Sequence, residues 1–262
     1  MPESRFSRRI GDLAFTEVGS AVRASSVVCL PMGSFEQHGP HLPLNTDAVL
    51  AEALTGRIVE RLGETYDLWQ LPLVPVGLSR EHAWAPGTLS LSVAGMTALM
   101  RDLVRDIARA LPARNLLIVN GHGGNRGLLE ALAREARFEF GLNLAALHLG
   151  PLMSAARERA VPEVHAGCDE TSAMLALAPQ LVRREALGRL AAPPDAAGVR
   201  SLVLDPAASF PWTSDDPRIA VEGVIGDARD ASAEHGAAIV ARVVKAADGV
   251  LRRLLEPPAV QG

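Results

Sequence analysis

Residues 26–54 read SVVCLPMGSFEQHGPHLPLNTDAVLAEAL, a polar stretch set between two apolar runs. The first run, residues 27–32, is short, apolar and followed by glycine, which is typical of a strand buried on both faces. Residues 47–62 place apolar side chains at helical spacing, with Asn45 or Thr46 as the expected N-cap. The polar stretch therefore joins a buried strand to a helix.

The same alternation continues along the chain. Apolar runs at residues 71–76, 116–120 and 144–149 predict three further strands, and residues 94–111 and 125–140 predict helices between them. Alternating strands and helices predict an α/β fold with right-handed crossovers. We therefore expect a mainly parallel sheet flanked by helices.

The chain is expected to form one domain over residues 1–262, because a chain of this length can bury one large core. Residues 191–217 are rich in Pro, Asp and Ser with little periodicity, and they predict a long loop or flap. Residues 231–255 have helical spacing and predict a final helix that closes the sheet.

The composition excludes several kinds of partner. The 26 basic and 30 acidic residues give a formal net charge of -4 without a long basic run, so neither nucleic acid nor a membrane surface is expected. No apolar run approaches the roughly 20 residues of a membrane span, and the N-terminal residues lack a continuous apolar segment. Cys29 and Cys168 are the only cysteines and form no disulfide framework, so a cytoplasmic location is expected.

Three potential metal ligands lie in the polar stretch. Glu36 and His38 are two residues apart just beyond the predicted strand, so in an extended backbone their side chains point the same way. Asp47 lies at the predicted helix start, where the helix dipole favours an ionised carboxylate. These three side chains can meet at one point, although an isolated Glu-x-His can also be a solvated pair.

A second group, NGHGGN at residues 120–125, follows a predicted strand and precedes a helix. In an open α/β sheet this is the carboxyl edge of the strands, where ligands bind. The glycines allow a tight turn that presents His122. The alternatives are a plain turn with His122 capping the helix, or a phosphate loop, which would need a Lys-Ser/Thr pair that is absent.

A third group, EVHAGCDETS at residues 163–172, leads into an apolar helix whose start can orient Glu170. Histidines mixed with carboxylates suit Zn²⁺, Mn²⁺ or Fe²⁺ and differ from the thiolate cages of structural zinc. If two ions bind, one carboxylate must bridge them and a water between them becomes hydroxide near neutral pH. Asp47 is the candidate bridge, while Glu170 could also be a carboxylate that interacts only with its own helix dipole.

Other uses of these residues are weaker. His41, His148 and His235 are expected to be structural, from their settings in a Pro-rich turn, an apolar strand and beside a glycine. A serine hydrolase is disfavoured because the segment nearest to G-x-S-x-G, GLSRE at residues 77–81, ends in glutamate. Cys168 as a nucleophile near His165 is a minor alternative.

Taken together, the sequence resembles the creatininase family of metal-dependent amidohydrolases. MGSFEQHGPHLPLNTD, PVGLSREHAWAPGTLSL, NGHGGN, HAGCDETSAMLALAP and EGVIGDARDASAEHG occur in the family's order, from about residue 27 to residue 244. The resemblance implies a three-layer α/β fold and assembly as a homohexamer. It also implies that two divalent ions bind to Glu36, His38, Asp47 and His122, with Asp47 shared between them, and that His165 passes protons.

Some positions depart from creatininase itself. It has a glutamate where this chain has Gly124, and we expect Glu170 to replace that ligand. It also has a glutamate in place of Val164, and tryptophans in a region where this chain has none between Trp84 and Trp212. These departures disfavour creatinine as the substrate.

The expected reaction is hydrolysis of a non-activated amide C–N bond by metal-bound hydroxide, with His165 protonating the leaving nitrogen. The expected substrate is a small-molecule amide or a short peptide, and the candidate residues for binding it are Ser79, Arg80, His82 and Trp212. Arg80 and His82 could equally be structural groups at the surface. NGHGGN and HAGxxETS look closer to branches that deformylate a pyrimidine intermediate or trim a C-terminal dipeptide from a mycofactocin precursor. Outside the enzymes, a metal-stabilised binding subunit is the alternative.

Overall fold

A computed structural model of the chain describes residues 7–154 and 160–256. Its sheet has four parallel strands in the order β2-β1-β3-β4. These are β1 (Val27–Met32), β2 (Leu68–Gln70), β3 (Asn115–Asn120) and β4 (Asn143–His148). The chain leaves β1 toward β2 and then returns to the other side of β1 for β3. The carboxyl ends of β1 and β3 therefore form the switch point at which open α/β sheets bind ligands.

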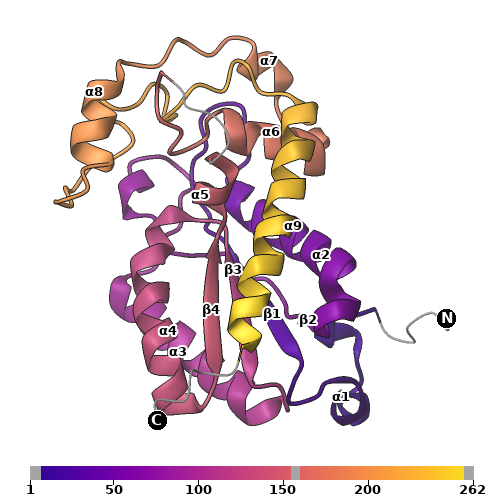
Figure 1. Cartoon of the computed structure of the whole chain (residues 1–262). Coiled ribbons are helices and arrows are strands. Elements are labelled where there is room, and N and C mark those ends of the chain that lie inside the picture. Colours follow the sequence, from indigo (N-terminus) through magenta and orange to yellow (C-terminus); the bar gives the residue numbers. More distant parts are fainter. Residues whose placement is uncertain (1–6, 155–159, 257–262) are drawn as a thin grey trace.

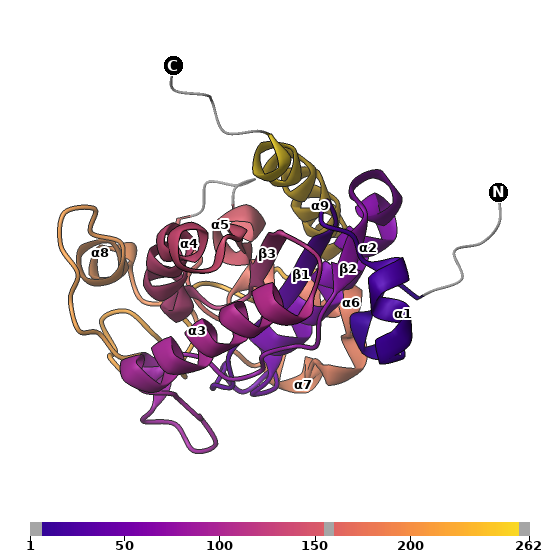
Figure 2. The same ribbon diagram turned by 90° about the horizontal axis from the view of Figure 1, so that it is seen from below.

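Helices cover both faces of the sheet (Figure 1, Figure 2). One face packs against α2 (Thr46–Tyr66), α6 (Cys168–Leu177) and α9 (Ala233–Leu255), and the other against α3 (Val93–Ala110) and α4 (Arg126–Phe140). Every residue of β1 and β3 is buried. Alternate residues of β1 enter different cores, because successive side chains of a strand point to opposite faces.

The predicted α/β class with a mainly parallel sheet between helices is confirmed. The helices predicted at residues 47–62, 94–111, 125–140 and 231–255 are α2, α3, α4 and α9. Asn45 precedes the first residue of α2 but makes no side-chain capping hydrogen bond.

The strand predicted at residues 71–76 is wrong, because the second strand is β2 at Leu68–Gln70. Pro72 and Pro75 have no N–H to donate to a ladder, which disfavours a continuous strand there. Val74 alone in this segment bridges β1, opposite Met32.

The remaining elements are short. Three of the shorter helices are α1 (Phe15–Ala21), α5 (Leu149–Ser154) and α7 (Arg184–Leu187). The predicted flap at residues 191–217 is largely irregular but contains α8 (Ala196–Gly198) and a π turn (Val199–Val203), and α8 lies apart from the layered core in Figure 1. None of the helices in the described part of the chain is both long and apolar enough to cross a bilayer.

At the end of α2 that lies far from Asp47, one carboxylate ties several segments together. Asp67 follows the helix with a positive φ of 50° and accepts hydrogen bonds from Ser26, Arg8 (3.3 Å) and Arg23 (3.0 Å). Burial raises the pKa of Asp67, but the bonds from Ser26 and Arg23 outweigh it, and the pKa lies below its ordinary value. The folded state therefore prefers the ionised carboxylate.

Replacing Asp67→Asn keeps a side chain that tolerates the left-handed conformation but removes the charge. We expect the free energy of unfolding at pH 7 to fall by about 1 kcal/mol, a small loss because solvent screens the largely exposed Arg23. A lowered pKa means that this stabilisation is complete above about pH 4 and disappears as the pH falls through the folded-state value. Urea unfolding at pH 7 and at about pH 3 measures it.

The control is Glu60→Gln, which removes an exposed ion pair with Arg57 from the same α2 helix and should change little. An Asp67→Asn loss that is the same at both pH values would contradict a role for the charge.

Candidate metal centre

All five predicted ligands lie at the carboxyl edge of the sheet. Glu36 and His38 come from the loop after β1, and His122 comes from the loop after β3. Asp47 is in the first turn of α2 and Glu170 is in the first turn of α6. Glu36, His38, Asp47 and His122 are buried, and the Glu170 side chain is 14% exposed. Neighbouring strands thus bring together side chains that are distant in sequence.

Two glycines let α2 approach the sheet edge. A Cβ on Gly33 would lie 2.4 Å from the backbone nitrogen of Ala48, and a Cβ on Gly121 would lie 2.5 Å from the carbonyl oxygen of Asp47. Any other residue would push the helix away at either place. Glycine after β1 and after β3 therefore sets the Asp47 carboxylate between the two loops.

The two oxygens of Asp47 face different sets of ligands. His122 Nδ1 lies 3.2 Å from Asp47 Oδ2 and 3.2 Å from Glu36 Oε1. His38 Nε2 lies 3.2 Å from Asp47 Oδ1 and 3.9 Å from Glu170 Oε2. Within each set the ligand atoms lie within 4.8 Å of one another. This arrangement suits two cations that share one bridging carboxylate.

Two buried carboxylate oxygens have no hydrogen-bond partner among the residues that the structure describes: Glu36 Oε1 and Asp47 Oδ2. A buried carboxylate oxygen without a hydrogen bond is costly, and a cation between the ligands would satisfy both atoms. The donors are imidazoles and carboxylates without a thiolate, a set that suits Zn²⁺, Mn²⁺ or Fe²⁺. The residues therefore fit divalent metal binding.

The electrostatics of the cluster favour positive charge. Burial lowers the pKa of His38, but Asp47 and Glu170 outweigh it and raise the pKa to about 9. For His122, Glu36 and Asp47 likewise overcome burial, and its pKa lies well above the ordinary value. Burial raises the pKa of Glu170 to about 7. Protons and metal ions therefore compete for the same atoms.

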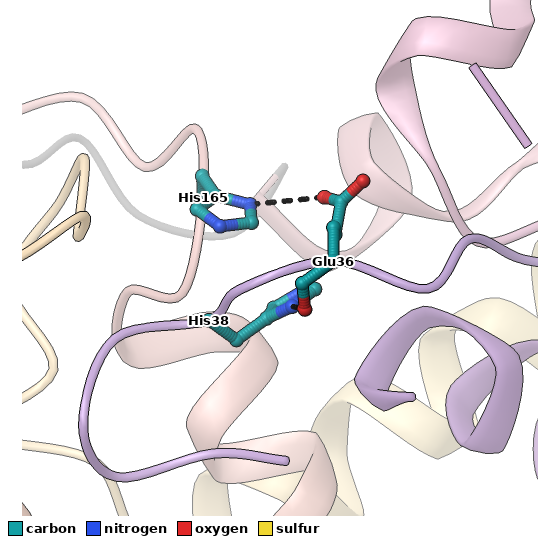
Figure 3. A group of neighbouring side chains, drawn as sticks. All are labelled: Glu36, His38 and His165. Carbon is teal, nitrogen blue, oxygen red and sulfur yellow. Dashed lines mark hydrogen bonds and ion pairs between the residues drawn. The ribbon is translucent and has the colours of Figure 1, made fainter. Parts of the chain in front are cut away.

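His165 lies across from Glu36 in Figure 3, with its Nδ1 3.5 Å from Glu36 Oε1. Its Nε2 is 2.7 Å from the backbone carbonyl of Gln37, which can only accept, so Nε2 carries the proton and Nδ1 has a free lone pair. Burial and the neighbouring His82 and His38 lower the pKa of His165 well below the ordinary value. His165 is therefore a neutral imidazole with an unprotonated nitrogen facing the cluster.

The four predicted substrate-binding residues lie in different settings. Ser79 donates a hydrogen bond to Glu36 Oε2, and His82 Nε2 lies 3.3 Å from Glu36 Oε1, so both contact a candidate ligand. The Trp212 ring meets the His82 ring edge-on at 6.1 Å. Arg80 is exposed, and none of the four residues lines the 330 Å³ cavity beside the cluster. A direct contact of any of them with substrate stays a prediction.

Sequence reasoning missed the groups that orient these side chains. His122 Nε2 lies 2.6 Å from the Leu78 carbonyl and 3.5 Å from Glu81 Oε1, which turns Nδ1 toward the cluster. The only signal for Glu81 was its place between Arg80 and His82, two of the predicted substrate-binding residues. The Gln37 side chain donates to Ser214 Oγ or the Gly223 carbonyl, both at 3.0 Å, in segments that no local pattern connects to it.

A cavity of about 330 Å³ opens beside the cluster. Its lining includes His122, His165 and Glu170. A wider groove of about 790 Å³ near Arg183 and Glu222 includes none of the candidate ligands. The smaller cavity is therefore the candidate substrate site.

Comparisons with known proteins found a matching family and several relatives. The family described as creatininase, creatinine amidohydrolase, matches residues 11–250. A mycofactocin precursor peptide peptidase of Mycobacterium ulcerans is 32% identical over 250 residues, which are 92% of each chain. A creatinine amidohydrolase of Pseudomonas putida is 30% identical over 273 residues, covering 95% of this chain and 97% of the relative. A shorter match, 31% identical over 122 residues and 44% of this chain, is to a 2-amino-5-formylamino-6-ribosylaminopyrimidin-4(3H)-one 5'-monophosphate deformylase of Methanothermobacter thermautotrophicus, covering 47% of that protein.

Solved structures show the same similarity. A mutant creatininase described as of the Zn-Zn type superposes with a TM-score of 0.74 at 30% identity, covering 96% of this chain and 100% of the other. A structure named creatininase Mn superposes with a TM-score of 0.71 at 28% identity and the same coverage. Zinc and manganese are both metals that the donor set of this chain suits.

Gly124 lies against the segment that orients His122, so its replacement tests that orientation. In Gly124→Ala the new Cβ would lie 2.2 Å from the Leu78 carbonyl oxygen and 2.5 Å from His122 Nε2, and the segment must move. We expect the Zn²⁺ affinity to fall by about 10- to 100-fold, as when an outer hydrogen bond to a ligand is lost. Competition with a chromogenic chelator measures it.

Gly123→Ala is the matched control, because a Cβ on Gly123 meets nothing within 4 Å. If the two variants bound Zn²⁺ equally well, the contacts of Leu78 and Glu81 with His122 would have no part in metal affinity.

Proposed function

The chain belongs to the creatininase family, and from this we propose that it is a metal-dependent hydrolase of a non-activated amide C–N bond. The observation that carries the proposal is the division of the two Asp47 oxygens between two sets of ligands. A single structural ion would not need two sets of protein ligands. Two ions beside a cavity with a neutral histidine are an arrangement typical of hydrolysis.

Each ion would have two ligands of its own and would share Asp47 with the other ion. Glu36, Asp47 and His122 would hold one, and His38, Asp47 and Glu170 the other. When bound, such ions polarise a substrate carbonyl and lower the pKa of water. With Glu170 in the second set, the chain needs no carboxylate at position 124.

His165 is the proposed proton carrier. Its free Nδ1 faces the cluster, and its lowered pKa keeps that nitrogen unprotonated, so it can take the proton of the attacking water. The hydrogen bond from Nε2 to the Gln37 carbonyl holds the ring in that orientation during the transfer. The protonated Nδ1 then delivers the proton to the leaving nitrogen, which makes the amine a better leaving group.

The cavity admits a small amide or the end of a short peptide. Val164, which lines it, offers no carboxylate to a substrate. Removal of a dipeptide from a precursor peptide and deformylation of a formamide are the two alternatives, because relatives named as a precursor peptide peptidase and as a deformylase match the chain. Hexameric assembly, a cytoplasmic location and a single domain stay predictions.

The test is turnover by metal-loaded protein. We expect protein loaded with Zn²⁺, Mn²⁺ or Fe²⁺ to hydrolyse at least one member of a panel of formamides, lactams and short peptides, and chelation to abolish this.

His165→Gln should lower kcat by about a hundredfold or more while the metal content is retained, because only proton transfer is lost. Cys168→Ser should keep full activity, since this thiol is buried outside the lining of the cavity. Mass spectrometry of the products measures each.

Two outcomes would overturn the proposal. Metal-loaded protein that hydrolysed nothing on the panel would point to a metal-stabilised binding subunit. Loss of activity in Cys168→Ser, with the metal still bound, would point to a thiol nucleophile.

A further inference from the structure

The lining of the cavity beside the metal cluster includes two nitrogen-bearing side chains with no role in the proposed reaction. Arg126 is the first residue of α4, and His148 is the last residue of β4. Both line the same 330 Å³ cavity as His122, His165 and Glu170. A ligand that reached the metal cluster could therefore extend to Arg126 and His148.

The hydrogen bonds of Asn120 determine the tautomer of His148. Asn120 Oδ1 faces the backbone N–H of His122 (3.3 Å) and Nδ2 of Asn125 (3.1 Å), so Asn120 Nδ2 is a donor. That donor lies 3.1 Å from His148 Nδ1, which must therefore accept. The hydrogen of His148 is then on Nε2, where no described residue accepts it.

Arg126 supplies a fixed charge beside this donor. Its Nε donates to Glu130 Oε1 at 2.8 Å, an exposed pair that solvent screens. Within residues 7–154 and 160–256 no acceptor meets its two terminal nitrogens. Burial and Arg126 lower the pKa of His148, so this imidazole is a neutral donor near pH 7. In the lining of the cavity, the terminal N–H groups of Arg126 and the Nε2–H of His148 thus have no acceptor among the described residues.

Two acids in the lining of the same cavity, Glu163 and Asp169, are already engaged. Glu163 accepts the backbone N–H groups of Asp169 (3.4 Å) and Asp227 (3.2 Å). Asp169 Oδ1 lies 2.7 Å from His235 Nε2. Neither acid needs Arg126 as a partner, and Arg126 is the one arginine or lysine among the described residues that line the cavity.

We propose that Arg126 and His148 form a subsite for an anionic group, a carboxylate or a phosphate, of the substrate. The inference rests on the proposed function and narrows its substrate class to amides with a negative group separate from the scissile bond. A guanidinium and an imidazole N–H suit such oxygens, because charge-assisted hydrogen bonds to Arg are the stronger kind. One relative is named for a precursor peptide, whose end is a carboxylate, and another for a 5'-monophosphate, so both kinds of anionic group are compatible with the relatives' names.

The test is binding of matched probes to Zn²⁺-loaded protein by calorimetry. The probes are N-acetylglycylglycine against its C-terminal amide, and ribose 5-phosphate against ribose. We expect the anionic member of one pair to bind about tenfold more tightly or better, and the pair that discriminates identifies carboxylate or phosphate as the source. Arg126→Gln should abolish this preference, and Arg126→Lys should keep part of it.

Arg134→Gln is the matched control, because Arg134 is exposed on the same α4 helix but outside the cavity, and it should keep the full preference. No preference in either pair, or a preference that survives Arg126→Gln, would overturn the subsite; the second result would mean that the anion binds elsewhere, such as at the metal ions. A preference that requires Arg126, in a protein that hydrolyses nothing, would support the subsite and refute the hydrolase.

Discussion

The close approach of the first turn of α2 to the ends of β1 and β3 is the constraint on which the site depends. At positions 33 and 121 only glycine leaves room for this approach, because any Cβ would collide with the backbone of α2. The result is one buried carboxylate, Asp47, at the switch point of a parallel sheet, with imidazoles on both of its oxygens. Everything else in the cluster is arranged around that carboxylate.

The cluster concentrates charge that the fold does not neutralise by itself. One oxygen each of Glu36 and Asp47 is buried without a hydrogen bond from any residue that the structure describes, and the carboxylate charges raise the pKa of the neighbouring His38 and His122. Such a cluster is costly to bury unless a cation occupies it. The chain therefore gives up some stability of its metal-free state to gain a preorganised set of ligands.

Much of the fold and of the ligand set could be predicted because both depend on local patterns. Buried strands such as β3 are continuous apolar runs, and parallel strands bring their carboxyl ends to one edge, so Glu36 and His122 could be expected to meet. The strand expected at residues 71–76 failed because two prolines interrupt an apolar run. The ligand roles themselves stay predictions that the geometry makes more specific.

The orienting groups could not be predicted, since they are backbone carbonyls and side chains from segments far apart in sequence. The Leu78 carbonyl on His122 and the Gln37 carbonyl on His165 leave no trace in residue type. His148 was expected to be structural, but it lies at the end of β4 and lines the cavity. The pattern of a strand predicts which face of the sheet a side chain points to. It does not predict which groups surround the end of the strand.

The central claim is that two metal ions share Asp47 and that Glu170 completes the second set. Metal content per chain, measured by elemental analysis of wild type and Glu170→Gln purified without added metal, tests it most directly. We expect two equivalents in wild type and one in the variant. At most one equivalent in wild type, unchanged by the substitution, would contradict it and would require a mechanism built on one ion.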